Sequence, residues 1–296
     1  MEEIGQVDRV EITCLIENSP RYDSYLMGCF GLSLWLKVWS GSRNWTLLFD
    51  VGPVAEALIH NARLLRLDLT TVDMIVLSHN HFDHTGALAG ILPHIGHEVP
   101  IFCHPDIFRD SFVLKPEFMN YALVGENRKE RLEDLGGYFV ATRSPIEPLP
   151  GFLLSGEVPR CTPFEETGGI SCFTTNAEGD LVPDPLLDDC SAFINVKNRG
   201  LVVLSGCSHA GPINILKHAL KITGVREIDG VLAGFHLVEA PEERVRLTVE
   251  ALQKLEPGWI APLHCTGLLP TARMAAAFGE RFREVHAGDV LTISGE

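Results

Sequence analysis

The chain has no pair of cysteines at Cys-x-x-Cys spacing, although it contains eight cysteines among its 296 residues. They stand singly at positions 14, 29, 103, 161, 172, 190, 207 and 265. Disulfide frameworks belong to short secreted domains, and a chain of this length with isolated cysteines does not fit that class. We therefore expect most of the eight to be small buried side chains in a protein of a reducing compartment.

Basic residues are also scarce, with 24 lysines and arginines against 39 acidic residues and a formal net charge of −15. Nonspecific binding to nucleic acid or to an anionic membrane needs a positive face. No apolar stretch reaches the length of a bilayer span, and residues 1–5 contain no basic region leading into an apolar run. These deficits predict no nucleic-acid partner, no membrane partner and a soluble, cytoplasmic protein.

Apolar residues are abundant, at 46 % of the chain, and there are 27 glycines. Both values suit a compact α/β protein, and we expect one domain over residues 1–296. The pattern of apolar residues predicts strands over 10–17, 28–39, 46–52, 74–77, 191–196, 200–205, 230–237 and 259–263. Helical spacing predicts helices over 53–67, 87–96, 213–222 and 241–255. Because each run of strands precedes amphipathic helices, we predict an α/β (α+β) fold of two mixed sheets packed face to face with helices outside.

Between residues 115 and 189 the periodicity weakens and prolines and glycines accumulate. So long an irregular stretch is not a plain connection inside a compact domain. We interpret it as an elaboration over the active site that decides the choice of substrate, with short strands near 138–141 and 152–154.

Three histidines and an aspartate follow directly after the apolar residues 74–77, in the order His79, His81, Asp83, His84. Side chains two positions apart on an extended segment point the same way, so His79 and His81 face one ion. Asp83 and His84 begin the next turn and face a second ion. The cluster predicts a site for one or two divalent metal ions on a single loop.

Two later strands also end in a histidine. The strand over 200–205 runs into Gly206-Cys207-Ser208-His209, and the strand over 259–263 runs into His264. In successive strand-helix units the strands are parallel, so their carboxyl ends lie at the same edge of the sheet. We therefore predict His209 and His264 as further metal ligands.

Two more residues are predicted to assist this site. Asp50 lies at the carboxyl end of the strand over 46–52, where a carboxylate can orient a ligand histidine, although an ordinary turn aspartate is the alternative. Arg160 offers the planar fork that best grips a phosphate or carboxylate, although a solvated loop cation is equally consistent with the sequence. We predict Asp50 as an orienting residue and Arg160 as a substrate-binding residue.

The segment Ser-His-Asn-His-Phe-Asp-His-Thr-Gly at 78–86 resembles the signature of the metallo-β-lactamase superfamily. Members hold one or two metals in such a loop between two β-sheets, and they have an acid at the position that corresponds to Asp50. The resemblance implies a four-layer αβ/βα sandwich of two mixed sheets flanked by helices. The superfamily includes many hydrolases, some transferases and a few oxidoreductases, so the likeness indicates the site better than the substrate.

One branch of the superfamily is resembled more closely, through Ser-Gly-Glu-Val-Pro-Arg at 155–160, Ser-Gly-Cys-Ser-His-Ala-Gly at 205–211, Ala-Gly-Phe-His-Leu at 233–237 and Pro-Leu-His-Cys-Thr-Gly at 262–267. This branch comprises the 7,8-dihydropterin-6-methyl-4-(β-D-ribofuranosyl)aminobenzene 5′-phosphate synthases. The likeness implies a transferase of methanopterin-type biosynthesis, which joins a dihydropterin-methyl diphosphate to an arylamine ribose phosphate.

The chain departs from the superfamily hydrolases at the bridging ligand. Those enzymes often carry an acidic Gly-Asp where this chain reads Gly206-Cys207. Either Cys207, as a thiolate, or His236 is expected to take this place, and occupancy by a single metal is the third alternative. His236 has a slight preference because it lies at the end of a predicted strand, as His209 and His264 follow theirs.

The expected cofactors are one or two divalent metal ions, zinc first, with iron, manganese and magnesium as alternatives. The metal would act as a Lewis acid on an ester, phosphoryl or diphosphate oxygen, and Asp83 and His236 are the predicted catalytic side chains. The expected partner is a small molecule, either a pterin or another phosphate-bearing compound. A general phosphoester or lactone hydrolase and a non-catalytic, metal-stabilised binding module are the alternatives.

Overall fold

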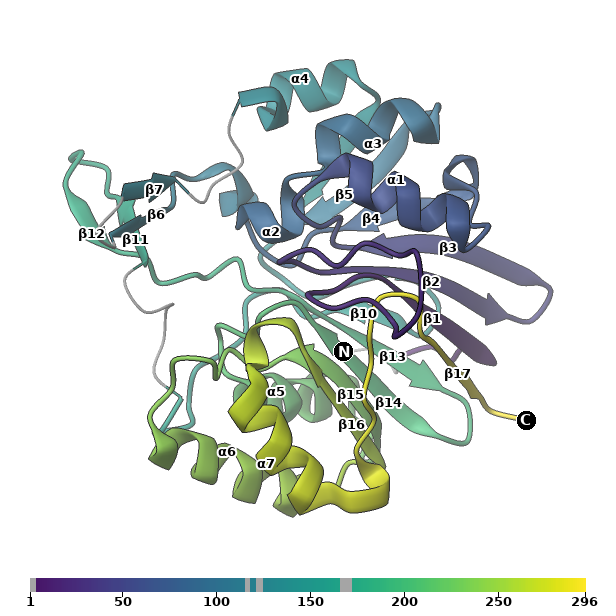
Figure 1. Ribbon diagram of the computed structural model, residues 1–296, viewed down its shortest axis with the longest axis vertical. Helices are drawn as coiled ribbons and strands as arrows, with labels where there is room; N and C mark the ends of the chain where they lie inside the picture. The colour runs from purple at the N-terminus through teal and green to yellow at the C-terminus, as the bar shows by residue number, and fades with distance from the viewer. Residues whose placement is uncertain (1–3, 115–117, 121–124, 166–171) are drawn as a thin grey trace.

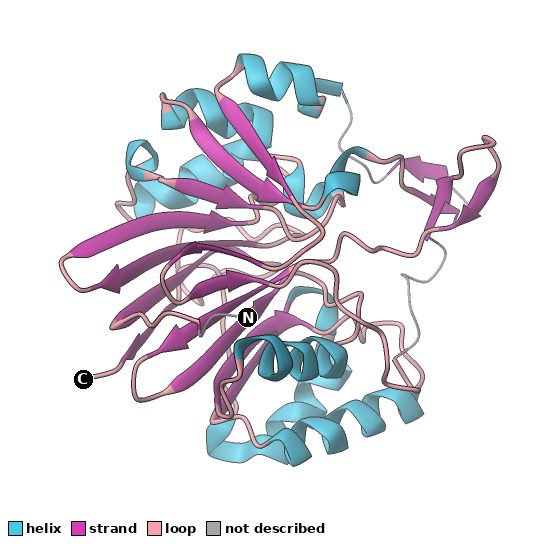
Figure 2. Ribbon diagram, turned by 180° about the vertical axis from the view of Figure 1, so that it is seen from behind, coloured by secondary structure: helices cyan, strands magenta, loops and turns pink. Residues whose placement is uncertain are grey.

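Two large β-sheets pack face to face, and helices cover the outer face of each (Figure 1). The structure is a computed structural model that describes residues 4–114, 118–120, 125–165 and 172–296. Figure 2, seen from behind, shows the same layers, with strands inside and helices on both sides. The predicted αβ/βα arrangement of two mixed sheets is therefore confirmed.

The first sheet contains, in spatial order, β17 (Val290–Ser294), β1 (Arg9–Ile16), β2 (Ser33–Ser40), β3 (Arg43–Phe49), β4 (Met74–Val76), β5 (Val99–Cys103) and β8 (Gly137–Ala141). Its strands are antiparallel from β17 to β3 and parallel from β3 to β8. Its outer face is covered by α1 (Ala55–Leu64), α3 (Leu88–Ile95) and α4 (Lys129–Asp134).

The second sheet contains β16 (Trp259–Leu263), β15 (Ile228–Gly234), β14 (Gly200–Ser205), β13 (Ser191–Val196), β10 (Phe152–Leu154) and β9 (Ile146–Leu149). Its parallel strands are β14, β15 and β16. Its outer face is covered by α5 (Pro212–Thr223), α6 (Glu242–Leu255) and α7 (Leu268–Phe278). In the part of the chain that the structure describes, no helix combines the length and the hydrophobicity needed to cross a bilayer.

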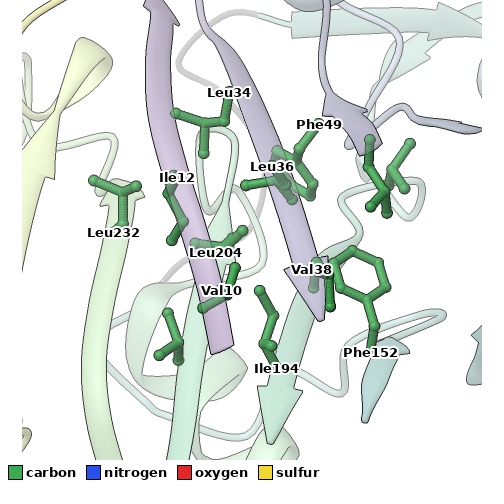
Figure 3. Packing of buried hydrophobic residues seen from close by; sticks show 14 of the residues in the cluster. Val10, Ile12, Leu34, Leu36, Val38, Phe49, Phe152, Ile194, Leu204 and Leu232 are labelled. Carbon is green, nitrogen blue, oxygen red and sulfur yellow. The ribbon is translucent and has the colours of Figure 1, made fainter. Parts of the chain in front are cut away.

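Strand alternation decides which side chains fill which layer. Leu36 of β2 and Leu204 of β14 point into the apolar cluster between the two sheets, where Figure 3 shows them. Trp35 and Val203, one position away on the same strands, face the outer helices instead. Close-packed apolar layers resist deformation, so a site built across both sheets stands on a rigid frame.

A small third sheet projects from one side of the sandwich (Figure 1). It consists of β12 (Leu181–Pro183), β11 (Cys172–Thr175), β6 (Phe112–Leu114) and β7 (Phe118–Asn120). The two short strands expected near 138–141 and 152–154 are present as β8 and β10, and each extends a large sheet. Residues 115–117, 121–124 and 166–171 of the expected elaboration lie outside the described residues.

The strand predicted over 28–39 starts only at Ser33. The preceding residues form a loop that is tied to α1 by the buried amide of Asn61. Its Nδ2 donates to the carbonyl oxygen of Met27 at 2.9 Å, and its Oδ1 accepts from the Met27 N–H at 2.8 Å. A buried amide satisfied in this way holds the loop against the sheet, which the two-residue period could not indicate.

The start of α5 combines a helix signal with a buried acid. Pro212, with its fixed φ, occupies the first turn. The two carboxylate oxygens of Glu165 accept hydrogen bonds from the N–H groups of Ile213 at 2.7 Å and Asn214 at 2.8 Å. An acid at this end of a helix satisfies N–H groups that have no partner within the helix.

Glu165 should make the stability of the fold depend on pH. Burial raises the pKa of Glu165 to about 7, although the two N–H groups of α5 oppose this effect. A carboxyl group with a raised pKa contributes stability that is present below its unfolded pKa and lost as the pH rises through its folded pKa. Between pH 5 and pH 8, the free energy of unfolding should therefore fall by roughly 1–3 kcal/mol more in the wild type than in Glu165→Gln. Urea unfolding at both pH values measures this difference, and equal changes in the two proteins would contradict it.

Candidate metal centre

The predicted ligands meet at one edge of the sandwich, behind the carboxyl ends of strands from both sheets. The loop over 78–84 follows β4, and its last residues form the first turn of α2 (Phe82–Thr85). Cys207 and His209 follow β14, and His264 follows β16. Because parallel strands bring their carboxyl ends to the same edge, residues far apart in the sequence share one site.

His79, His81 and His209 form one side of the cluster. The ring centroid of His79 lies 4.6 Å from that of His81 and 4.8 Å from that of His209. The ring centroids of His81 and His209 are 5.0 Å apart. All three side chains are buried. His209 therefore lies beside His79 and His81, although it follows a strand of the other sheet.

Asp83, His84 and His264 form the other side. The Nε2 atoms of His84 and His264 lie 3.2 Å apart, and Asp83 Oδ2 is 3.5 Å from the first and 3.2 Å from the second. The rings of His79 and His84 have centroids 4.3 Å apart, so the two sides are adjacent.

Cys207 belongs to both sides. Its sulfur lies within 4.8 Å of the donor atoms of all three residues on the second side, and of those of His79 and His209 on the first. His236 instead shares a separate group with Cys207 and Cys265. Its ring centroid is 4.4 Å from that of His209, so it borders the cluster.

Four residues of the site have positive φ although none is glycine. The values are 57° at Asp50, 54° at Ser208, 45° at His236 and 51° at His264. The left-handed turn at His236 also explains why β15 ends at Gly234 and not at residue 237, as the sequence had predicted. Each such residue costs about 1–3 kcal/mol, and such strain gathers where a side chain must point in one direction.

Several buried atoms of the cluster face no hydrogen-bond partner. Among the described residues these include His79 Nε2, Asp83 Oδ1 and both ring nitrogens of His209. Burying such groups unpaired is costly unless a cation accepts their lone pairs. Imidazole nitrogen, carboxylate oxygen and thiolate sulfur are the donors that zinc and related ions bind. The residues therefore fit a divalent metal centre.

Asp50 orients one histidine on each side of the cluster from inside the protein. Its Oδ2 accepts from His84 Nδ1 and from the Ser78 hydroxyl, each at 2.7 Å, and its Oδ1 accepts from the Ser78 N–H at 2.7 Å. The Ser78 hydroxyl in turn lies 2.9 Å from His79 Nδ1. An imidazole whose Nδ1–H is engaged presents the Nε2 lone pair to a metal.

Asn18 and Glu17 hold His264, and sequence reasoning missed both. Asn18 Oδ1 lies 3.0 Å from His264 Nδ1, and Asn18 Nδ2 donates to the carbonyl oxygen of His264 at 3.1 Å. Glu17 accepts from the His264 N–H at 2.8 Å. No local pattern could reveal contacts between residues that lie almost 250 positions apart in the chain.

The electrostatics differ between the two sides. Burial lowers the pKa of His79 and His209 well below the ordinary histidine value and that of His81 to about 4. Burial also lowers the pKa of His84. The neighbouring carboxylates of Asp83 and Asp50 outweigh burial, however, and raise the pKa of His84 to about 9. The first side therefore offers neutral imidazoles with available lone pairs, and on the second side the two carboxylates favour a positive charge, which a bound cation would supply.

A partly buried arginine outside the predicted set, Arg109, fixes the loop over 78–84. Arg109 pairs with Asp188 at 2.7 Å and with Asp184 at 2.9 Å. The same Asp188 oxygen accepts from the Asn80 N–H at 2.8 Å, and the Asn80 side chain donates to the Arg109 carbonyl oxygen at 3.1 Å. The network explains how a loop rich in buried polar groups keeps one shape.

Arg160, the predicted phosphate ligand, is directed elsewhere. Its guanidinium donates to the backbone carbonyl oxygens of Pro185 and Leu186, the latter at 2.7 Å. A pocket of about 320 Å³ opens beside the cluster, and Arg160 is not among the residues that line it. Apolar walls come from Phe30, Val113, Cys172 and Val238.

Residues 46–132 match the model of the β-lactamase superfamily domain, in agreement with this fold and this site. The chain belongs to the metallo-β-lactamase superfamily. It is also 39 % identical over 290 residues to the 7,8-dihydropterin-6-methyl-4-(beta-D-ribofuranosyl)-aminobenzene-5'-phosphate synthase of Methanocaldococcus jannaschii. That match covers 97 % of this chain and 98 % of the relative, so the chain belongs to the family that includes this synthase.

Two further proteins are similar to this chain, one in sequence and one in structure. An uncharacterized protein of Methanocaldococcus jannaschii is 30 % identical over 250 residues, which is 84 % of this chain and 90 % of that protein. The crystal structure of Tm1679, described as a metal-dependent hydrolase of the β-lactamase superfamily, has a TM-score of 0.76 at 22 % identity. It covers 96 % of this chain and 99 % of its own, which supports the fold.

The Asp50→Asn variant should lose metal affinity while remaining folded. An amide can still accept from Ser78, but its NH₂ group cannot accept the Nδ1–H of His84. Loss of such an orienting partner lowers metal affinity by about 10- to 100-fold. Competition with a chromophoric chelator measures it. The matched control is Asp73→Asn, since Asp73 accepts from the Thr46 N–H at 2.7 Å and lies outside the cluster; equal affinities in the two variants would count against the role of Asp50.

Proposed function

We propose that this protein is a metal-dependent transferase that joins a dihydropterin-methyl diphosphate to an arylamine ribose phosphate. The observation that carries the proposal is the 39 % identity to the Methanocaldococcus jannaschii synthase over nearly the whole of both chains. The buried cluster of histidines with Asp83 and Cys207 supports it, because displacement of a diphosphate needs a site that can bind a concentrated negative charge.

We assign two divalent ions to the cluster, with zinc as the first choice for a site of nitrogen, oxygen and sulfur donors. His79, His81 and His209 would hold one ion. Asp83, His84 and His264 would hold the second.

Cys207 is the group that we place between the two ions. Its sulfur is within 4.8 Å of donor atoms on both sides, whereas His236 groups with the two cysteines at the edge. The geometry thus supports the cysteine over the histidine that strand position alone had slightly favoured. A thiolate in this place favours zinc or another ion that tolerates soft ligands.

Bound metal ions would supply Lewis-acid stabilisation of the leaving diphosphate. In the reaction the bond between the pterin methylene carbon and the diphosphate oxygen breaks, and its electron pair leaves with the diphosphate. The arylamine nitrogen bonds to the same carbon and loses a proton. His236 lines the pocket, and its Nδ1 has no hydrogen-bond partner among the described residues, so we assign it the role of accepting that proton. Asp83, which also lines the pocket, would help to hold one of the metal ions.

Release of diphosphate should require both substrates. We expect the metal-loaded protein to release diphosphate from 6-hydroxymethyl-7,8-dihydropterin diphosphate only when the arylamine ribose phosphate is present, because the amine is the nucleophile. A coupled diphosphate assay with and without the amine measures this. Equal release without the amine would indicate a hydrolase of the same superfamily. Metal binding without any turnover of the pterin, phosphoester or lactone substrates would indicate a binding module.

Two variants should separate the bridging role from the proton-accepting role. Cys207→Ser should lower the metal content by about one ion per chain, because a neutral hydroxyl is a poor substitute for a bridging thiolate. His236→Ala should keep its metal and lose most of its turnover, by about 10²- to 10⁴-fold.

Metal analysis after gel filtration, together with the diphosphate assay, tests both variants. Cys103→Ser is the matched control, since Cys103 is a buried cysteine on β5 that lies in the apolar cluster beneath the helices. Full metal content in Cys207→Ser with loss of an ion in His236→Ala would reverse the assignment.

A further inference from the structure

We propose that Asp188 and Asp189, on a segment fixed by Arg160, are positioning residues that keep the two ligand loops of the metal centre at one spacing. The inference rests on the part of the proposed function that gives one ion to ligands from both sheets. That ion takes two ligands from the loop over 78–84 and one from the turn after β14. Its geometry therefore depends on how these two parts of the chain are spaced.

Two consecutive carboxylates bond to different ligand loops. Asp188 Oδ2 accepts a hydrogen bond from the Asn80 N–H at 2.8 Å, in the loop over 78–84. Asp189 Oδ2 accepts from the Ala210 N–H at 2.8 Å, directly after the ligand that follows β14. Both acids are only 1 % exposed, so the bonds are shielded from water. Because the Cα atoms of consecutive residues lie about 3.8 Å apart, the two loops cannot separate without breaking one of the bonds.

The residue after this pair adds a third bond. The Cys190 N–H donates to the Ser78 carbonyl oxygen at 2.8 Å, and the chain then enters β13 of the second sheet. The segment over 184–190 therefore runs from the small third sheet to the second sheet and bonds to a ligand loop of the first. Its bonds join the two large sheets at the edge where the metal centre lies.

Two arginines hold the segment itself. Arg109 pairs with two of its acids. Arg160 donates to the backbone carbonyl oxygens of Pro185 and Leu186. Leu186 is fully buried and has a φ of 48°, a left-handed conformation that a leucine adopts only where its surroundings impose it. These contacts give Arg160 the role of fixing the backbone that leads into the two carboxylates.

The two carboxylates act through other residues. Among the described residues, neither Asp188 nor Asp189 belongs to a group of donor atoms that could hold an ion. Neither of them lines the pocket beside the cluster, and Arg160 does not line it either. Their effect is therefore on the positions of the ligands, in the way that residues behind a metal site orient the side chains that bind the ion.

The test uses Arg160→Gln, Asp189→Ala and Asp189→Asn. Arg199→Gln and Asp229→Ala are the matched controls, since Arg199 and Asp229 form an ion pair of 2.8 Å. Asp229 lies at the start of β15 and Arg199 directly before β14, so this pair is at the end of the sheet opposite the metal centre. Measured for each protein are the dissociation constants for Zn²⁺ by chelator competition, the visible absorption spectrum of the Co²⁺ form, KM and kcat, and urea unfolding of the metal-free protein.

Asp189→Ala and Arg160→Gln should each weaken the binding of one ion by about 10- to 100-fold, because loss of a residue that positions a metal ligand acts on that scale. Their Co²⁺ spectra should differ from that of the wild type, since the visible bands report the coordination geometry. Asp189→Asn should bind metal within about threefold of the wild type, because its amide oxygen still accepts the Ala210 N–H. The two controls should keep their metal affinity within about twofold, whatever stability they lose, because distant sites act independently.

Metal affinities and Co²⁺ spectra of Asp189→Ala and Arg160→Gln that equal those of the controls would overturn the inference. A raised KM in Arg160→Gln with an unchanged Co²⁺ spectrum would also overturn it, because Arg160 would then be a substrate ligand. If Asp189→Ala does not fold, Arg160→Gln decides, since the Arg160 side chain is partly exposed and its removal leaves both carboxylates in place.

The metal measurements separate this inference from the proposed transferase, because they need no turnover. If the wild type forms no product from the pterin diphosphate and the amine, but Asp189→Ala and Arg160→Gln bind metal more weakly than the controls, the positioning role stands and the transferase does not. If the wild type forms product and these two variants bind metal as the controls do, the transferase stands and the positioning role is wrong.

Discussion

The structure depends on a concentration of buried lone pairs, several of which have no hydrogen-bond donor among the described residues. Five imidazoles, a carboxylate and a thiol meet in one buried volume, and the atoms without partners among the described residues include both ring nitrogens of His209. A protein keeps such an arrangement only if a cation accepts the lone pairs, since hydrophobic packing alone does not compensate for unpaired buried polar atoms. The carboxylate of Asp50, the amide of Asn18 and the strained backbone at His264 all serve to aim donors at the same volume.

The two sheets divide this task between them. The first sheet supplies the loop over 78–84, and the second supplies Cys207, His209 and His264. Each sheet thus carries one set of predicted ligands. The distance between these two sets is set by the apolar layer between the sheets, where Leu36 and Leu204 pack. Because that layer is close-packed, it transmits small changes of side-chain volume, and a core residue far from the metal centre still influences its geometry.

The sequence was sufficient for the features that have a local pattern. Alternating apolar residues indicated both sheets, and the spacing of His79, His81, Asp83 and His84 indicated a metal loop before any fold was known. His209 and His264 could be added because each follows a strand. The missed residues, among them Asn18, Arg109 and Phe30, act through contacts with segments far away in the chain, and their neighbours in sequence carry no sign of this. Arg160 is the opposite case, in which the residue type predicted a role that the contacts do not support. Its guanidinium donates to the carbonyl oxygens of a nearby loop.

The pairing of β17 with β1 has a consequence for how the protein is made. β1 lies near the start of the chain, and its outer edge is covered by β17, whose register runs from Arg9 opposite Ser294 to Thr13 opposite Val290. The ribosome synthesises β1 long before β17, so the outer edge of β1 has no strand beside it during the synthesis of the residues between them. Unpaired strand edges recruit other strands, including those of neighbouring nascent chains. The nascent protein is therefore exposed to aggregation while the residues between these two strands are synthesised. A chaperone that shields β1 during this time would raise the yield of folded protein.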